Sequence, residues 1–83
     1  MNRRALPFSK SLFISRMLKQ RRKLGWTRKK LADRTYISPV TLMNYERGLA
    51  LPNIEKAYSI AVALGVTMDW LCGYDQAKEG LSK

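Results

Sequence analysis

The stretch between residues 38 and 47 carries side chains whose types and spacing suit contacts with the bases of a nucleic acid. On a helix, with about 100° between successive residues, Leu42 and Tyr45 lie on one side, and the opposite side carries Val40, Met43, Asn44 and Arg47. Asparagine bonds the N6 and N7 edge of adenine, apolar groups contact thymine methyls, and arginine reaches guanine or phosphate. This side favours a DNA major groove, although a small patch for a partner protein also fits.

A short helix with clear boundary signals must position these side chains. Ser38 is a good capping residue, and Pro39 suits the first helical position because proline has no N–H to leave unpaired. Gly48 is a typical stop signal. The sequence therefore predicts a helix from Pro39 to about Arg47, with one apolar side that needs other elements to pack against.

Four further helices are predicted around it from the apolar spacing and from capping residues. They are expected from Ser9 or Ser11 to about Leu24, from Thr27 to about Arg34, from Pro52-Asn53 to Leu64 and from Met68 to Cys72. No β pattern accompanies them, so we expect an all-α fold of five helices. Residues 9–74 would form this domain, between a flexible basic N-terminal arm (1–8) and a polar C-terminal tail (75–83).

The net charge of +10 is distributed unevenly along the chain. Residues 1–48 contain thirteen Lys and Arg against two acids, whereas residues 49–83 contain three against four. Lysines kept only for solubility would be spread more evenly. A polarised basic half predicts a polyanionic partner, and we expect double-stranded DNA.

The start of the second predicted helix carries cations where helix stability disfavours them. Arg28, Lys29 and Lys30 occupy its first turn, where the helix dipole opposes each exposed cation by roughly 0.3–1 kcal/mol. A phosphate at this end would reverse the conflict and accept bonds from the free backbone N–H groups. The pattern thus indicates a phosphate contact at the start of this helix.

Several functional classes are excluded by what the sequence lacks. It has no histidine and one cysteine, Cys72, which removes the commonest general base, the commonest metal ligand and any internal disulfide. We expect no enzyme, no catalytic residue, no metal site and no cofactor. No segment approaches the roughly 20 apolar residues of a membrane span, so we expect a cytoplasmic protein with no membrane partner.

Many spaced residues agree with one known family. The run is Trp26-Thr27-x-x-x-Leu31-Ala32-x-x-x-x-Ile37-Ser38-x-x-Thr41-Leu42-x-x-Tyr45-Glu46-Arg47-Gly48, then Pro52, then Ala61-x-Ala63-Leu64-Gly65-Val66-x-x-Asp69-Trp70-Leu71. It resembles the phage repressor and Cro-like (XRE-type) helix-turn-helix domain over about residues 13–73. The resemblance implies a sequence-specific DNA-binding regulator, with the second helix crossing the phosphate backbone and the third lying in the major groove.

The resemblance also assigns roles to particular residues. Base-reading positions fall on Pro39, Val40, Thr41 and Asn44, to which the helical wheel adds Met43. Phosphate positions fall on Thr27, Arg28 and Arg47, and the first-turn cations add Lys29. Arg21 and Glu46 match a buried structural ion pair that ties the first helix to the end of the third.

The sequence departs from the family pattern at three places. Tyr36 stands in the turn where the family usually has glycine, which implies an altered turn or a contact that holds the tyrosine. The loop from Leu49 to Pro52 lacks the basic residues that often grip phosphate. Pro39 and Val40 replace amides, so specificity is expected to rest on methyl contacts and on DNA shape.

Related proteins usually bind pseudo-palindromic operators as dimers, and we expect a homodimeric repressor. The expected dimer surface is the end of the fourth helix and the fifth helix, with Val66, Met68, Leu71, Cys72 and Tyr74. The alternative is an antitoxin-type protein, which binds a partner protein as well as its own promoter. A longer apolar C-terminal segment would favour that alternative, whereas this tail is short and polar.

Overall fold

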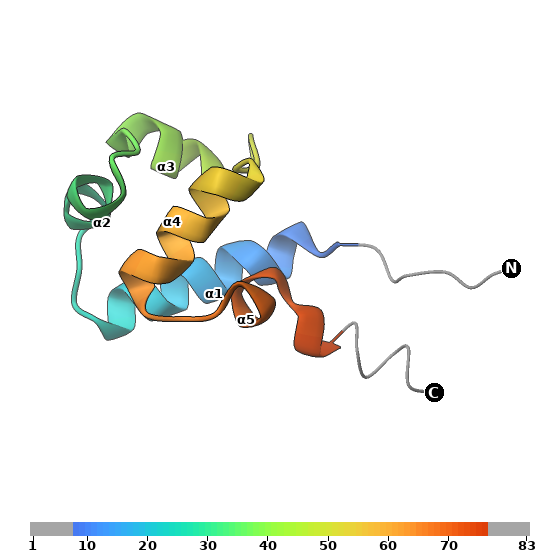
Figure 1. Cartoon of the computed structure of the whole chain (residues 1–83). Coiled ribbons are helices and arrows are strands. Elements are labelled where there is room, and N and C mark those ends of the chain that lie inside the picture. Colours follow the sequence, from blue (N-terminus) through green and yellow to red (C-terminus); the bar gives the residue numbers. More distant parts are fainter. Residues whose placement is uncertain (1–7, 77–83) are drawn as a thin grey trace, which may run out of the picture.

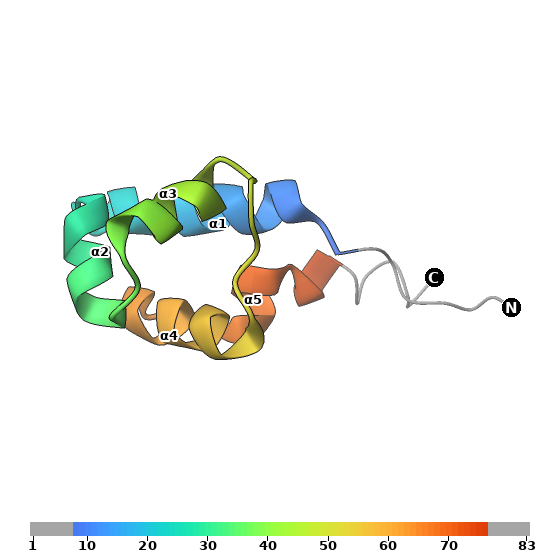
Figure 2. The same ribbon diagram turned by 90° about the horizontal axis from the view of Figure 1, so that it is seen from above.

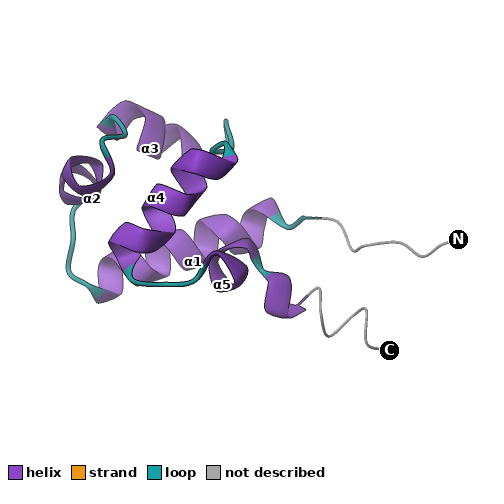
Figure 3. Cartoon of the chain, viewed as in Figure 1, coloured by secondary structure: helices purple, strands orange, loops and turns teal. Residues whose placement is uncertain are grey.

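The structure is a computed structural model that describes residues 8–76. Its five labelled helices are α1 (Lys10–Lys23), α2 (Arg28–Thr35), α3 (Pro39–Glu46), α4 (Ile54–Leu64) and α5 (Met68–Cys72), and a short helical turn follows at residues 74–76 (Figure 1). Within residues 8–76 every regular element is a helix (Figure 3). The prediction of an all-α fold is therefore confirmed. The fifth helix has the expected bounds, and the boundaries of the others differ from the expected ones by at most two residues.

Each helix begins at a residue whose side chain accepts a hydrogen bond from the free backbone of its first turn. Ser9, not Ser11, caps α1, and the other caps are Thr27, Ser38, Asn53 and Thr67. Such a cap contributes about 1 kcal/mol. Because five caps stand at the five sites where the sequence placed helix starts, local signals fix the element order.

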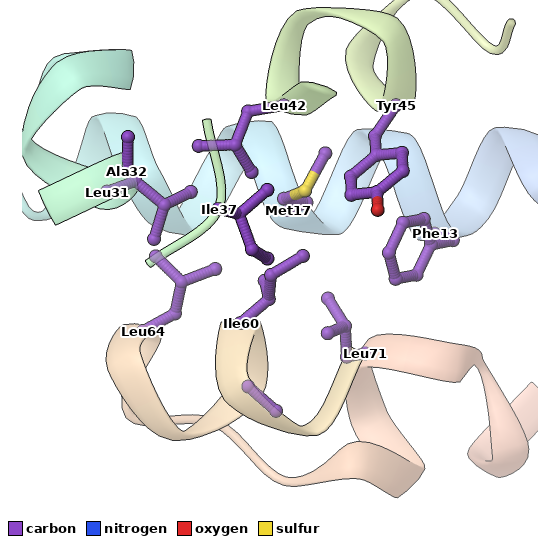
Figure 4. Packing of buried hydrophobic residues seen from close by; sticks show 11 residues of the cluster. Phe13, Met17, Leu31, Ala32, Ile37, Leu42, Tyr45, Ile60, Leu64 and Leu71 are labelled. Atoms are coloured by element: carbon purple, nitrogen blue, oxygen red, sulfur yellow. The ribbon is translucent and has the colours of Figure 1, made fainter. Parts of the chain in front are cut away.

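The core lies where all five helices meet (Figure 4). Met17 from α1 and Leu42 from α3 point toward one another, and Ile60 and Leu71 approach from the opposite side. All four are fully buried. Burying a side chain of this size contributes about 1.5–3 kcal/mol to the free energy of unfolding. This cluster therefore fixes the position and orientation of α3 relative to the other helices.

α3 and α4 pack on α1 from different sides, while α2 packs against both of them. Seen from above, α3 runs along α1, and α4 is set off from that pair (Figure 2). One long side of α3 therefore faces the core. No element of residues 8–76 covers its other side.

The C-terminal end of the described chain is held to α1 by Arg16. Its guanidinium contacts the Asp75 carboxylate at 2.7 and 3.1 Å, donates to the Trp70 carbonyl and lies 4.9 Å from the centre of the Trp70 ring. The hydrogen bond from Arg16 lowers the pKa of Asp75 to about 2. Residues 74–76 are helical, so Asp75, which we had placed in a separate tail, packs with the domain; residues 77–83 lie outside the described residues.

At the other end, Phe8 is the one residue of the expected N-terminal arm that the structure describes. Its ring lies 6.2 Å from that of Phe13, at a tilt of 46°. Residues 1–7 of the expected arm lie outside the described residues.

The turn between α2 and α3 keeps a left-handed residue although that residue is tyrosine. Tyr36 has φ 60° and ψ 22°, and it is 98 % exposed. The turn is thus not rebuilt to suit a side chain, and no packing holds the ring in place. A left-handed non-glycine residue costs roughly 1–2 kcal/mol, and nothing in the surroundings of Tyr36 offsets this cost.

We expect Tyr36→Gly to raise the free energy of unfolding by about 0.5–1 kcal/mol. Glycine removes the left-handed penalty, and its greater freedom in the unfolded chain offsets part of the gain. Urea unfolding followed by circular dichroism measures the change. Gly25→Ala is the matched reverse, because Gly25 has φ +72° with nothing near its missing Cβ, and it should destabilise by about 1 kcal/mol. A destabilised Tyr36→Gly variant would show that the tyrosine makes a stabilising contact.

Candidate nucleic-acid interface

The uncovered side of α3 carries the residues to which we assigned base reading. Pro39 and Val40 are exposed, with Val40 at 62 %, and Thr41, Met43 and Asn44 are half-buried. The Asn44 amide has no hydrogen-bond partner among residues 8–76, so its donor and acceptor are available to a ligand. The Thr41 hydroxyl accepts a bond from the Ser38 hydroxyl at 2.8 Å. This side of α3 therefore presents the free amide of Asn44, three apolar side chains (Pro39, Val40 and Met43) and the Thr41 hydroxyl, whose own proton is free to donate.

The N-terminus of α2 carries the predicted phosphate contacts. Thr27 caps the helix by accepting from the Lys30 N–H at 3.1 Å, which leaves its hydroxyl proton free to donate. Lys29 forms an exposed pair with Asp33 at 3.2 Å, an interaction worth about 0.3–0.5 kcal/mol that an incoming phosphate can replace. Arg47, at the C-cap of α3, is exposed. These residues are all accessible to a polyanion.

Trp26, which lies just before α2, contacts two cations of that helix. It is half-buried against the core, and the charged ends of Lys30 and Arg34 lie 5.9 and 5.4 Å from its ring centre. A cation over an aromatic face gains about 0.5–1 kcal/mol at an exposed site. Two further positive charges are thus held along α2.

Glu46 joins two arginines at the base of this surface. Arg21 Nε lies 3.3 Å from Glu46 Oε2, and the Glu46 side chain is only 6 % exposed. These two atoms approach without the alignment of a hydrogen bond, so their attraction is electrostatic. Arg21 also donates to the Trp26 carbonyl at 2.9 Å. The contact links α1 to the end of α3, where we had placed a structural ion pair.

The sequence analysis missed the second partner of Glu46, which is Arg28. Its Nε and Nη2 donate to Glu46 Oε1 at 3.0 and 2.8 Å. We had assigned Arg28 to phosphate and Glu46 to structure, and the fold brings the two together. The available signal was that an acid at the C-terminal end of a helix opposes the helix dipole, as does a cation at the N-terminal end.

The predicted dimer surface is wrong at Leu71. This residue is fully buried in the core cluster because α5 turns it toward α1 and α4. Val66, Met68 and Cys72 are half-buried, and Tyr74 is 50 % exposed. Burial raises the pKa of the Cys72 thiol, and nearby Asp69 raises it further.

An apolar pocket that the sequence did not indicate lies beside Met68 and Cys72. It has a volume of about 340 Å³, and its outer rim includes Phe8, Leu51 and Ile54, which are 51 %, 48 % and 80 % exposed. The apolar surface at this end of the molecule therefore extends from α5 to the loop before α4.

Residues 8–76 contain neither a membrane-spanning helix nor a cluster of metal-ligating side chains. None of the helices there is long and apolar enough to cross a membrane. The same residues contain no group of three metal-ligating side chains of the His, Cys, Asp and Glu types.

Comparisons with known proteins agree with this geometry. Residues 17–71 match a family model described as helix-turn-helix. Over 58 residues, 70 % of this chain, the sequence is 38 % identical to the cryptic phage CTXphi transcriptional repressor RstR of Vibrio cholerae serotype O1, and it spans about half (52 %) of the length of that curated relative. The fold is similar to that of the P22 c2 repressor protein, solved in complex with synthetic operator 9T. That likeness has a TM-score of 0.69 and 28 % identity, and it covers 72 % of this chain and 91 % of that one.

Proposed function

Because the chain belongs to the phage repressor and Cro-like (XRE-type) helix-turn-helix family, we propose that it is a sequence-specific DNA-binding transcriptional repressor. The observation that carries the proposal is the uncovered side of α3, with a free amide at Asn44 and the exposed Val40, next to a cationic helix start. The solved structural relative is a repressor in complex with a synthetic operator, which supports operator binding by this fold.

Base reading falls to α3. Asn44 would bond one adenine edge, while Val40 and Met43 would contact thymine methyls. Pro39, which has no N–H to donate, would approach the groove wall. The Thr41 hydroxyl accepts a bond from Ser38 but keeps its own proton, so it would be able to donate to a base or a phosphate. With one amide as the main hydrogen-bonding reader, DNA shape would carry part of the discrimination.

Affinity without sequence preference would come from the cations around α3. Thr27, Arg28, Lys29 and Arg47 would bind phosphates, and each neutralised phosphate releases counterions, so binding weakens as salt rises. Repression would follow from occupancy, because a protein seated on a promoter blocks polymerase. The protein would act in the cytoplasm, where it has access to DNA.

The dimer would form across the apolar end of the molecule. The predicted surface keeps Val66, Met68, Cys72 and Tyr74, and the pocket rim adds Leu51 and Ile54. This end belongs to the nearly neutral half of the sequence, so two copies can meet there with little repulsion between their basic halves. A two-fold dimer would then read two half-sites about 34 Å apart.

Asn44→Ala should weaken binding to the preferred duplex by roughly 1–3 kcal/mol and leave binding to random-sequence duplex nearly unchanged. Arg28→Ala is the paired variant, and it should weaken both to a similar extent because a phosphate carries no sequence information. Fluorescence anisotropy titrations against both duplexes, with the preferred site recovered by selection, measure the difference. Equal losses on both duplexes in both variants would refute base reading by Asn44.

A further inference from the structure

Glu46 lies between one buried arginine and one partly exposed arginine. The Arg21 side chain is 12 % exposed, whereas that of Arg28 is 40 % exposed. Two cations share one acid, so the cluster retains one positive charge. The difference in exposure places that charge on the side of Arg28, where solvent and ligands reach it.

The contact with Glu46 fixes the plane of the Arg28 guanidinium. Nε and Nη2 both donate to the same oxygen, Oε1, at 3.0 and 2.8 Å. A guanidinium has five N–H donors in one rigid plane, and this side-on contact occupies two of them. The other three, two on Nη1 and one on Nη2, have no protein acceptor among residues 8–76 and do not face Glu46 Oε1.

Both charges stand at helix ends that disfavour them. Arg28 is the first residue of α2, and Glu46 is the last residue of α3. Their mutual contact relieves the conflict with the dipole of α3 but leaves the N-terminus of α2 without an anion. The first bond within α2 is made by Leu31 N–H to Thr27 O, so the N–H groups of Arg28 and Lys29 precede it and are free to donate.

We propose that Glu46 is a positioning residue for phosphate binding, in addition to its place in the packing of α1 on α3. It holds the Arg28 plane across the start of α2, so that the free guanidinium edge and the free backbone N–H groups bind one phosphate of a duplex together. The inference rests on the proposed function, because it names how one phosphate contact of that interface is built.

The direction in which Glu46→Gln changes the affinity for DNA distinguishes a positioning role of Glu46 from an effect of its charge alone. Removing an acid close to a polyanion ordinarily tightens binding, because the net positive charge rises. If Glu46 positions Arg28, Glu46→Gln instead weakens binding to a labelled random-sequence duplex by about tenfold, the worth of one charge-assisted contact. The slope of log affinity against log salt should fall by about one.

Asp33→Asn is the matched control for Glu46→Gln. Asp33 is also an acid near the same surface, but it is exposed and pairs with Lys29 rather than Arg28. Its removal should tighten binding or leave it unchanged. Weakening by Asp33→Asn equal to that by Glu46→Gln would overturn the inference.

Arg28→Lys keeps the experiment decisive if Glu46→Gln does not fold, because it leaves the contact between Arg21 and Glu46 in place. Lysine retains the charge but cannot make the side-on contact with two N–H groups. It should lose most of the affinity that Arg28→Ala loses. The inference would be overturned if Arg28→Lys bound with wild-type affinity, or if a folded Glu46→Gln bound as tightly as the wild type or more tightly. Failure of the wild-type chain to bind the duplex at all would instead overturn the proposed function.

Discussion

Val40→Glu is expected to lower the affinity for duplex DNA by at least about 100-fold while the fold stays intact. Val40 is 62 % exposed in the first turn of α3, so the longer side chain displaces no packing, and an acid near a helix start suits the helix dipole. In the groove, the carboxylate would meet phosphates and base acceptors. Like charges brought together at an interface cost several kcal/mol, and each 1.4 kcal/mol is about a factor of ten.

Val62→Glu is the control for this prediction. Val62 is 60 % exposed on α4, so the substitution makes the same change in size and charge on a different helix. A charge more than a Debye length from the duplex is largely screened at physiological salt, and affinity should change by less than about threefold. Anisotropy titrations of both variants, with circular dichroism to confirm folding, make the comparison. Equal losses would show that the duplex does not lie on α3.

Leu71→Ala is expected to lower the free energy of unfolding by roughly 2–5 kcal/mol. The side chain is fully buried, so its truncation removes apolar burial and leaves a cavity in the core. A domain of this size has a total stability of about 3–10 kcal/mol, and the thermal midpoint should fall by at least about 10 °C. Thermal unfolding followed by circular dichroism measures the loss.

Protein concentration decides whether Leu71 acts within one protomer or between two. Truncating a core residue lowers the thermal midpoint by the same amount at every protein concentration. Truncating a residue in a dimer contact weakens association, so the loss of thermal midpoint depends on protein concentration. Tyr58→Ala serves as the comparison, since Tyr58 is 60 % exposed on α4 and lies outside the proposed dimer surface; a surface truncation usually changes stability by less than about 0.5 kcal/mol. If the stability loss of Leu71→Ala disappeared at high protein concentration, Leu71 would be a dimer-contact residue and not a core residue.

The helices could be predicted because their signals are local. Ser38 followed by Pro39 marks the start of α3, and Gly65 adopts the left-handed conformation that ends α4. The spacing of Phe13, Met17 and Leu24 likewise indicates one inward side of α1. Phe13 and Met17 are buried as that spacing predicts, whereas Leu24, at the C-cap, is 41 % exposed. These signals act within a few residues, so they do not depend on how the helices pack.

The outward side of α3 could also be placed from the sequence. Leu42 and Tyr45 had to be buried, which left Val40 and Asn44 on the side that the structure leaves uncovered. The roles assigned to them stay predictions until binding is measured.

Contacts between helices could not be predicted in the same way. Arg28 meets Glu46 across 18 positions of sequence, and Arg16 meets Asp75 across 59, so both depend on how the helices dock. Leu71 was misplaced because α5 has five residues, too few for apolar spacing to show which side faces inward. The length of a helix and the separation of its partners thus limit what the sequence reveals.

Selection of bound sequences from a pool of random duplexes tests the central claim, that the uncovered side of α3 reads DNA, most directly. We predict enrichment of a two-fold symmetric motif with half-sites about one helical turn apart, bound in preference to a scrambled competitor at moderate salt. Recovered sequences indistinguishable from the starting pool would contradict sequence reading by this protein.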